Sequence, residues 1–439
     1  MQLVEKHIIG RSDPRYNAID EAAFKSKNLY NATLYIVRQV FILEGEYLNY
    51  NTMDKVMQKH EAYGELPTKV AQMAVKQVHE AWVSYFKAIT EYRKHPEKFK
   101  ARPKLPGYKD KGEGRNLLVY NMQAVGRGKR TLDRGLVKPS QLDITVKTRQ
   151  NPKAIDQVRI VPRKGYYVVE IVYERKESQA EVNHEYIAGV DLGINNLLAL
   201  TSNKPGFQAV VVNGRPIKSV NQYYNKRKAA LQKALRHTGS TRRMERMTNK
   251  RTRRIDHYMH TASKQVVDLL VREGIGMLVI GKNDGWKNGV EMGKRNNQSF
   301  VQIPHARFIL YLKYKAELVG IEVKVTEESY TSKASLLDLD PMPVYDPKSK
   351  EKPKFSGKRI KRGLYQASDG RLINADINGA GNSIRKVAPK AFKGVEDGKA
   401  SALHSLVVHP VRLVVTPSQN QKGKSKRESK HSIERYKTL

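Results

Sequence analysis

The sequence predicts an α/β domain with a partly parallel sheet, preceded by a smaller β-rich domain that carries an inserted helical segment. Two observations predict this arrangement. In the second half of the chain, nearly continuous apolar strands alternate with helical patterns. In the first half, strand-like runs lie on either side of a long stretch with helical periodicity. The chain has 439 residues, of which 39% are hydrophobic. That is enough material for two or three domains with real cores.

The N-terminal half is expected to contain two domains. Residues 1–14 look like a strand that ends in a turn, and residues 15–97 repeat apolar side chains at helical spacing. Residues 98–183 begin with a Pro-, Gly- and Lys-rich stretch and then alternate as strands, with a hairpin turn at Arg163-Lys164-Gly165. We expect a small β-barrel or sheet from residues 1–14 and 98–183, with the helical segment inserted in it.

The α/β domain is expected over residues 184–415. Its elements are a strand in IAGVDLG, a strand in VVVNG, one long helix from about Ser219 to Arg272, a strand in MLVIG, a helix over His305–Val319 and a strand in IEVKV. Residues 416–439 are basic and poor in apolar residues, so we expect this tail to be disordered.

The net charge predicts a polyanionic partner. Lys and Arg total 81 against 43 Asp and Glu, which gives a formal net charge of +38 at pH 7. Such a charge repels itself strongly unless a polyanion neutralises it, and nucleic acid is the obvious candidate. The alternative is a solvated basic surface, as in a structural protein that coats RNA.

Basic residues gather on the predicted long helix and in a later segment. Twelve Lys or Arg lie between Lys226 and Arg254, with only Glu245 opposing them. A charge run is usually a solvated face, but in so basic a protein it favours contact with a phosphate backbone. The candidate contacts are Lys226, Arg227, Lys228, Arg242, Arg243, Arg251, Arg253 and Arg254, together with Lys358, Arg359, Lys361 and Arg362 from FSGKRIKRG.

The composition also excludes several classes of site. The chain has no cysteine, so disulfides, cysteine nucleophiles and Cys-ligated zinc are excluded. An ordinary cytoplasmic setting fits this composition. No apolar run reaches the length of a membrane span, and the N-terminus lacks the apolar core of a signal peptide. We therefore expect no membrane partner.

Three acidic positions stand at strand ends or in adjacent polar turns. They are Asp191 in AGVDLGINN, Glu327 or Glu328 in VKVTEESYTSK, and Asp376 in LINADINGAGN. Each alone is explained as well by a turn, a surface position or a helix N-cap. Together they resemble an oxygen-rich cluster for two Mg²⁺ ions, with Mn²⁺ as a substitute. Candidate residues around the cluster are Asn195, Thr331, Ser332, Asn378 and Asn382.

The order of these motifs resembles the TnpB family of transposon-encoded RNA-guided nucleases. The resemblance covers about residues 185–390 and rests on AGVDLGINNLLAL, RRIDHYMHTASKQVVDLL, YLKYKAELVGIEVKVTEESYTSKAS and GRLINADINGAGNSIRK. It implies a RuvC-like nuclease domain of RNase H type and a β-barrel wedge domain with an inserted helical recognition lobe. It also implies a guide RNA from the transposon end and double-stranded target DNA beside a short motif. By the same resemblance we expect a cytoplasmic protein that associates with the prokaryotic nucleoid when it is bound to DNA.

The chain departs from the family pattern at two places. Family members commonly carry the middle catalytic glutamate directly after the strand equivalent to MLVI, where this chain has Gly281. We expect Glu328 to replace it, with Glu327 as the alternative. The family usually also has four zinc-binding cysteines between Ser335 and Asp376. Here we expect no zinc and a cysteine-free insertion at about 335–372, held by phosphate contacts of its basic segment.

The predicted function is a guide-RNA-dependent DNA endonuclease in which Asp191, Glu328 and Asp376 hold two Mg²⁺ ions. Three alternatives remain open at this point. The first is a type V CRISPR effector, or an intermediate between the two systems. The second is a nuclease-inactive RNA-guided repressor, and the third is a basic RNA-binding structural protein. The sequence leaves the oligomeric state open.

Overall fold

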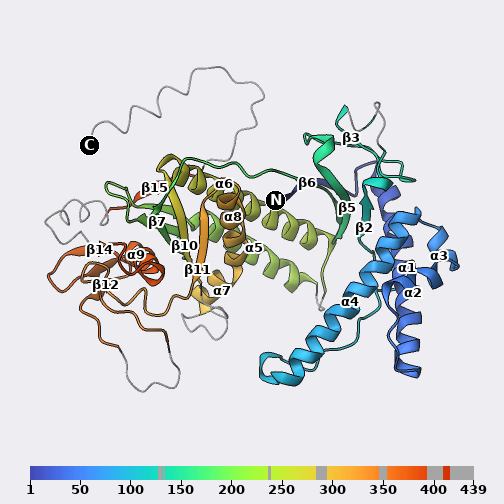
Figure 1. Ribbon diagram of the computed structural model, residues 1–439, viewed down its shortest axis with the longest axis horizontal. Coiled ribbons are helices and arrows are strands. Elements are labelled where there is room, and N and C mark those ends of the chain that lie inside the picture. Colours follow the sequence, from blue (N-terminus) through green and yellow to red (C-terminus); the bar gives the residue numbers. More distant parts are fainter. Residues whose placement is uncertain are drawn as a thin grey trace. The chain divides into compact units, whose positions relative to one another are not determined.

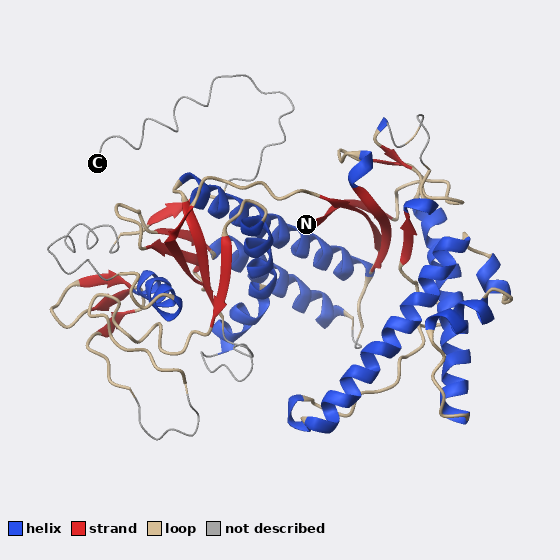
Figure 2. Ribbon diagram, in the orientation of Figure 1, coloured by secondary structure: helices blue, strands red, loops and turns tan. Residues whose placement is uncertain are grey.

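The computed structural model describes residues 1–126, 131, 134–235, 239–282, 294–345, 353–392 and 409–415 (Figures 1 and 2). The chain divides into two compact units, Met1–Lys176 and Glu177–Leu439. The sequence placed the boundary between the β-rich and α/β domains at 183/184, a few residues later. The predicted tail at 416–439 lies outside the described residues.

The first unit contains a four-stranded antiparallel sheet in the order β1-β6-β5-β2. The strands are β1 (Gln2–Gly10), β2 (Leu118–Asn121), β5 (Ile155–Arg163) and β6 (Tyr166–Glu174). Strands β5 and β6 form the predicted hairpin, with Arg163 paired to Tyr166. Gly165 lies in the turn with a φ of 82°, a conformation that glycine adopts without strain.

The sheet is not the closed barrel that the sequence suggested. In the described part of the first unit, β1 and β2 are the two edges, and a separate two-stranded sheet joins β3 (Leu136–Val137) to β4 (Val146–Lys147). The strands between residues 98 and 150 are four, two and two residues long. Strands this short offer too few ladder hydrogen bonds to close a barrel.

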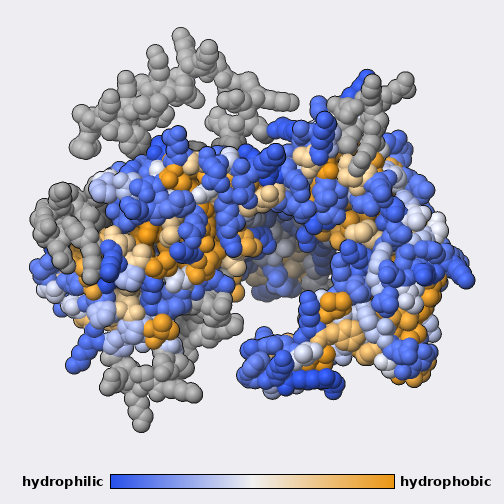
Figure 3. Space-filling view, viewed as in Figure 1, coloured by the Kyte–Doolittle hydropathy of each residue, from blue (hydrophilic) through white to orange (hydrophobic). Residues whose placement is uncertain are grey.

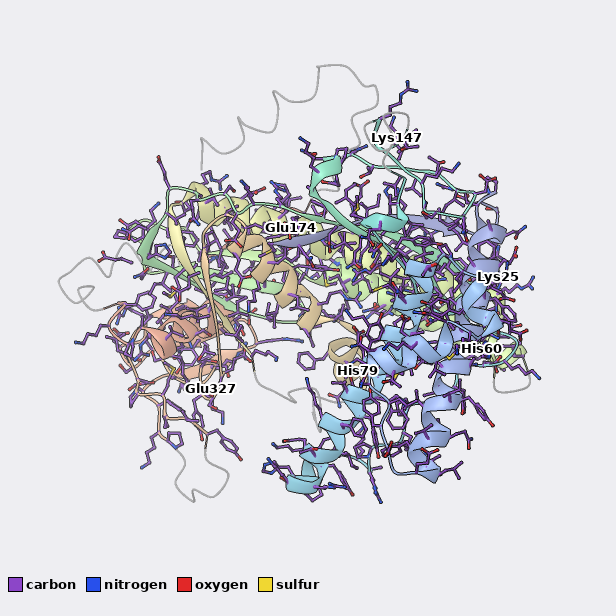
Figure 4. All side chains as sticks on the ribbon, turned by 45° about the vertical axis from the view of Figure 1, so that its right-hand side comes forward. Lys25, His60, His79, Lys147, Glu174 and Glu327 are labelled. Atoms are coloured by element: carbon purple, nitrogen blue, oxygen red, sulfur yellow. The ribbon has the colours of Figure 1, made fainter. Side chains whose placement is uncertain are left out.

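The helices of the first unit share one core with its sheet. They are α1 (Tyr16–Leu43), α2 (Tyr50–Met57), α3 (Glu61–Gly64) and α4 (Thr68–Lys94), with short 3₁₀ turns at Pro96–Lys98, Met122–Ala124 and Pro152–Ala154. Ile9 of β1, Trp82 of α4 and Leu118 of β2 are fully buried in this core. His79, labelled on α4 in Figure 4, hydrogen-bonds the Tyr47 hydroxyl at 2.7 Å. The helical segment is therefore packed on the sheet.

The second unit is built on a mixed six-stranded sheet in the order β11-β10-β7-β8-β9-β15. Strands β7, β8 and β9 are antiparallel neighbours, whereas β10 runs parallel to both β7 and β11, and β15 runs parallel to β9. The strands are β7 (Asn183–Asp191), β8 (Asn196–Ser202), β9 (Val210–Asn213), β10 (Ile275–Gly281), β11 (Glu322–Thr326) and β15 (Val411–Leu413). This confirms the predicted α/β domain with a partly parallel sheet.

Helices cover both faces of this sheet (Figure 2). One core contains residues of α6 (Arg242–Arg272) and α8 (His305–Glu317) against the sheet. A second core joins the other face to α9 (Ala375–Val387) and to a small sheet of β12 (Lys358–Lys361), β13 (Leu364–Gln366) and β14 (Leu372–Asn374). Strand β14 runs directly into α9. This second face is the one that carries the acidic residues.

The predicted long helix is two helices. Helix α5 (Arg215–Ala234) ends before α6 begins at Arg242, and the Thr241 hydroxyl caps α6 by accepting a hydrogen bond from Met244 N. Tyr224 bonds Thr248, and Asn221 bonds Arg251, so the two helices pack antiparallel. The signal that we missed is Gly239-Ser240-Thr241, which combines a helix breaker with an N-cap. A further short helix, α7 (Lys294–Gln302), precedes α8.

The hydrophilic character of the surface agrees with the high content of charged residues in the sequence. Hydrophilic residues predominate on the face shown in Figure 3, with hydrophobic residues scattered among them. Within the described residues, no helix combines the length and apolar character that crossing a bilayer requires.

Candidate active site

Asp191 is the last residue of β7 and faces α9. Residues of β7 alternate between the two cores, and Gly189 and Asp191 lie on the α9 side. A methyl group added to Gly379 of α9 would lie 3.3 Å from the Asp191 carboxylate, so this glycine leaves room for it. Burial raises the pKa of Asp191 well above its usual value, and the charges of Glu328 and Asp376 raise it further, against Arg359. The charges of two other acids thus act on Asp191 at this sheet edge.

Glu328 reaches over Gly281, the residue that follows the strand MLVI. A methyl group added to Gly281 would lie 2.5 Å from Glu328 Oε1 and 2.6 Å from its Cγ. Strand β10 is the parallel neighbour of β7, with Ile280 opposite Val190, so the next position lies beside Asp191. The Glu328 side chain therefore occupies the space that a side chain at position 281 would fill. Burial raises the pKa of Glu328 to about 7, and the charge of Glu327 adds to the increase.

The Glu327 side chain extends toward α9. Its carboxylate accepts hydrogen bonds from Lys386 Nζ of α9 and, at 2.7 Å, from Ser329 N. Figure 4 labels Glu327 close to the α9 ribbon. Burial alone would raise the pKa of Glu327, but the bonds from Lys386 and Ser329 outweigh burial and lower it. Of the two glutamates, Glu327 is neutralised by a lysine, whereas the charge of Glu328 raises the pKa of Asp191.

Asp376 lies in the first turn of α9, after the N-cap residue Asn374. The Asn374 side chain caps the helix by accepting hydrogen bonds from the backbone N–H groups of Asp376 and Ile377. The Asp376 side chain is therefore not needed as a cap. Its Oδ2 accepts a hydrogen bond from Asn196 Nδ2 at 2.8 Å, and its Oδ1 lies 3.5 Å from Arg359 Nη2.

A cavity of about 730 Å³ opens beside Asp191 and Asp376. The turn between β7 and β8 forms one wall, and Gly193 is required there because a methyl group would lie 2.6 Å from Asn196 O. Four arginines also line the cavity: Arg215, Arg359, Arg362 and Arg412. Guanidinium groups opposite carboxylates suit a phosphodiester, because they bind its oxygens while the carboxylates face a cation.

Of the other residues expected around the acids, some lie near them and others do not. Asn195 lines the cavity, and the Thr331 hydroxyl donates to Glu328 O at 3.0 Å, which fixes the turn after that glutamate. Ser332 is exposed. Contrary to expectation, the amides of Asn378 and Asn382 are fully buried and bond the backbone of residues 331–336.

Asn196, which bonds Asp376, was missed by the sequence analysis, as were Arg215 and Arg412. Adjacent asparagines follow Asp191 in the sequence, and nothing in the pattern distinguishes Asn195 from Asn196. Arg215 and Arg412 stand in no motif at all.

The predicted phosphate contacts differ in exposure. Most are exposed or partly exposed on α5, on α6, and on β12 or directly after it: Lys226, Arg227, Lys228, Arg242, Arg243, Arg253, Arg254, Lys358, Arg359, Lys361 and Arg362. Arg251 is partly exposed as well, but its guanidinium is engaged by other residues. Its guanidinium bonds Asn221 Oδ1 at 2.6 Å and Gln302 O at 3.3 Å and lies over the Tyr224 ring. Arg251 therefore links α6 to α5.

The donor set fits a hard divalent cation. The side chains around Asp191 offer carboxylate and amide oxygens, which Mg²⁺ prefers. Burial first, and then the charges of Glu328 and Asp376, raise the pKa of Asp191, and a bound cation would offset both effects. Within the described ranges, no three His, Asp or Glu side chains already lie close enough to enclose one ion. Asp376 is engaged with Asn196 and Arg359 instead.

Comparisons with known proteins match this half of the chain in two segments. A family model described as a probable transposase (OrfB_IS605) matches residues 170–287, which include Asp191 and Gly281. A model described as a Cas12f1-like TNB domain matches residues 305–383, which include Glu328 and Asp376.

Individual proteins are similar over most of the chain. The TnpB-like protein ORF457 of Acidianus two-tailed virus is 23% identical over 401 residues, which cover 82% of this chain and 81% of that protein. A cryo-EM structure of a Cas12f1-sgRNA-target DNA complex is 14% identical, with a TM-score of 0.49 over 84% of this chain and 81% of that chain. A CRISPR-Cas12f ternary complex is 12% identical, with a TM-score of 0.32 over 83% of this chain and 80% of that chain.

The two family models fall on the segments that carry the acidic positions, and the viral relative matches most of the chain. They support a transposon-associated nuclease of RuvC type, a class that generally uses divalent metals. Together, these matches support a protein of the TnpB family.

Proposed function

We propose that this protein is an RNA-guided DNA endonuclease of a transposable element, with Asp191, Glu328 and Asp376 as the ligands of two Mg²⁺ ions. The observation that carries the proposal is the position of Glu328 over Gly281. The Glu328 side chain lies where a side chain at position 281 would be, and its charge raises the pKa of Asp191. In this proposal, Glu328 takes the place of the glutamate that family members carry at that position.

Each group of residues has a defined task in this proposal. Two Mg²⁺ ions, when bound, would lower the pKa of the attacking water and stabilise the leaving oxygen of the phosphodiester. Asp191, on a rigid central strand, fixes the site to the sheet, and Asn196 orients Asp376 through its hydrogen bond. The four cavity arginines would hold the phosphate oxygens of the substrate. Cleavage would leave 5′-phosphate and 3′-hydroxyl ends.

The net charge of the chain and its similarity to TnpB proteins both support nucleic acids as partners. A net charge of +38 suits a protein that covers a long polyanion. The similarity to TnpB proteins supports a guide RNA from the transposon end and double-stranded target DNA, with base pairing reading the target.

The first test recovers the bound RNA. The protein is expressed with its native flanking DNA and purified through high salt, which removes nonspecific electrostatic binding. We expect one structured RNA with an end that runs past the transposon boundary. RNA built from array repeats would instead favour a CRISPR effector, an alternative that the match to a Cas12f1-like domain also favours. Heterogeneous RNA would overturn guidance.

The second test separates the two glutamates. We expect Glu328→Gln to abolish Mg²⁺-dependent cleavage by the RNA-bound protein and Glu327→Gln to retain it. The double variant Gly281→Glu with Glu328→Ala should recover part of the activity, because the new carboxylate occupies the same space. Cleavage that survives both Gln variants would contradict the site. Guided binding by a parent that never cuts would favour the repressor.

A further inference from the structure

The insertion between β11 and β14 is held by a cluster of aspartates and serines. We call residues 335–340 the anchor loop. Asp340, which is 4% exposed, accepts hydrogen bonds from Ser335 N at 2.8 Å, Ser356 N at 3.1 Å and Ser356 Oγ at 2.6 Å. Asp338 accepts hydrogen bonds from Ser368 N at 3.0 Å and Ser368 Oγ at 2.6 Å. Two carboxylates thus connect the anchor loop to points before β12 and after β13.

The anchor loop is also fixed to α9. Arg385 Nη2 donates to Asp340 O at 2.9 Å, and Leu336 N donates to Asn378 Oδ1 at 2.9 Å. Leu339 adopts a φ of 52°. A leucine holds this conformation only where its surroundings determine it strongly. Hydrogen bonds to carboxylates are about twice as strong as neutral ones, so these connections can supply that constraint.

The insertion carries arginines to the acidic cavity. Arg359 of β12 lies 3.5 Å from Asp376, and Arg362 and Gly363 line the same cavity. Ala375 N, at the start of α9, donates to Gly363 O at 3.1 Å. The position of Arg359 therefore depends on how firmly β12 and β13 are held to α9.

We propose that Asp338 and Asp340 form a metal-independent clasp that positions Arg359 at the acidic cavity. The part of this inference that concerns catalysis rests on the proposed nuclease function. Asp338 and Asp340 are positioning residues, because each acts through the strands that it holds. The sequence analysis expected phosphate contacts of the basic segment to hold this insertion. The structure assigns that task to carboxylate–serine pairs that need no bound nucleic acid.

Hydrogen–deuterium exchange of the purified full-length protein tests the clasp without any activity. We expect Asp338→Ala and Asp340→Ala to speed exchange in peptides covering 353–374 by about tenfold or more, as loss of a charged hydrogen bond implies. The matched control is Asp369→Ala in the same hairpin, whose carboxylate pairs with Arg371 two residues along. The control should change exchange less than about twofold.

A chelator treatment and a second Asp340 variant complete this experiment. A zinc chelator should leave exchange of the wild-type insertion unchanged, whereas faster exchange would show that a metal holds it and would overturn the proposal. Asp340→Asn preserves the side-chain shape and serves if Asp340→Ala does not fold. Unchanged exchange in both Asp338→Ala and a folded Asp340 variant would also overturn the clasp.

Cleavage kinetics test the link to Arg359. At saturating target, Asp340→Ala and Arg359→Ala should each lower kcat. The double variant should be no slower than Arg359→Ala alone, because both changes remove the same guanidinium from the cavity. Additive losses would overturn the positioning role. If the parent does not cleave at all, the proposed function fails, and exchange still decides whether the clasp exists.

Discussion

The charge of Glu328 is unfavourable in the folded chain without a cation. Burial raises the pKa of Glu328 to about 7. In the unfolded chain its pKa is near the ordinary value of 4.5. The folded state therefore binds the proton of Glu328 more tightly than the unfolded chain does. The destabilisation of the folded state by this charge is fully present above pH 7 and disappears as the pH falls to 4.5. We expect Glu328→Gln to stabilise the EDTA-treated protein at pH 8 by roughly 1–3 kcal/mol and to have little effect at pH 4.5. Urea unfolding across this pH range measures the difference.

The neighbouring residue Glu327 serves as the control, because we expect its replacement to destabilise the folded protein instead of stabilising it. Glu327 accepts a bond from Lys386, whose side chain is 7% exposed, so Glu327→Gln removes the partner of a buried ammonium. We expect Glu327→Gln to destabilise the same protein at pH 8. Added Mg²⁺ should stabilise the wild type more than Glu328→Gln. An equal response of the two to Mg²⁺ would contradict the role of Glu328 as a ligand.

At the scale of residues, the sequence could predict the acids but not their surroundings. Asp191 and Asp376 stand beside glycines at strand or helix ends, which is a local signal. The choice of Glu328 over Glu327 depends on which side of the sheet each faces, and the sequence left that open. The roles of Asn196, Asn378 and Asn382 depend on contacts between segments far apart in the chain, which a single sequence does not encode locally.

At the scale of elements, close contact between β7 and α9 holds the site together. A methyl group added to Gly189 would lie 2.1 Å from Ala380 O and 2.6 Å from Ile384 Cγ1. We expect Gly189→Ala to push α9 away from the sheet and to lower the free energy of unfolding by about 2 kcal/mol or more. Denaturant unfolding measures this. The control is Gly363→Ala, where an added methyl meets nothing within 4 Å and stability should change by less than about 0.5 kcal/mol. Equal losses in both variants would show that the close packing does not matter.

Elements were predicted best where their pattern was long and regular. The strand–helix alternation of the second unit and the β5–β6 hairpin follow from periodicity. The break between α5 and α6 was missed because the basic composition continues across it, although Gly239 and Thr241 mark the end of one helix and the start of the next. Closure of a barrel depends on which edges pair, a property that strand patterns do not contain.

At the scale of the whole molecule, the excess of positive charge must be divided between binding and structure. Lys226, Arg227 and Lys228 lie together on α5 and are exposed or partly exposed, whereas Arg251 is engaged with Asn221 and Gln302. Each neutralised phosphate contributes about 0.9 to the slope of log K against log salt for duplex DNA. We expect replacement of the three α5 cations by Gln to reduce that slope by up to about 2.7, measured with a nonspecific duplex across a salt series.

Arg251→Gln is the matched control, because it also removes a cation but from a packed position. Loss of the Arg251 guanidinium should lower the melting temperature of the protein. The slope of log K against log salt should stay within the error of the wild type, because a guanidinium held between helices α5 and α6 does not displace counterions from DNA. If the α5 triple variant keeps the wild-type slope, the basic face of α5 is a solvated surface and the polyanion binds elsewhere. If Arg251→Gln lowers the slope as well, its side chain must leave the helix pair when nucleic acid binds.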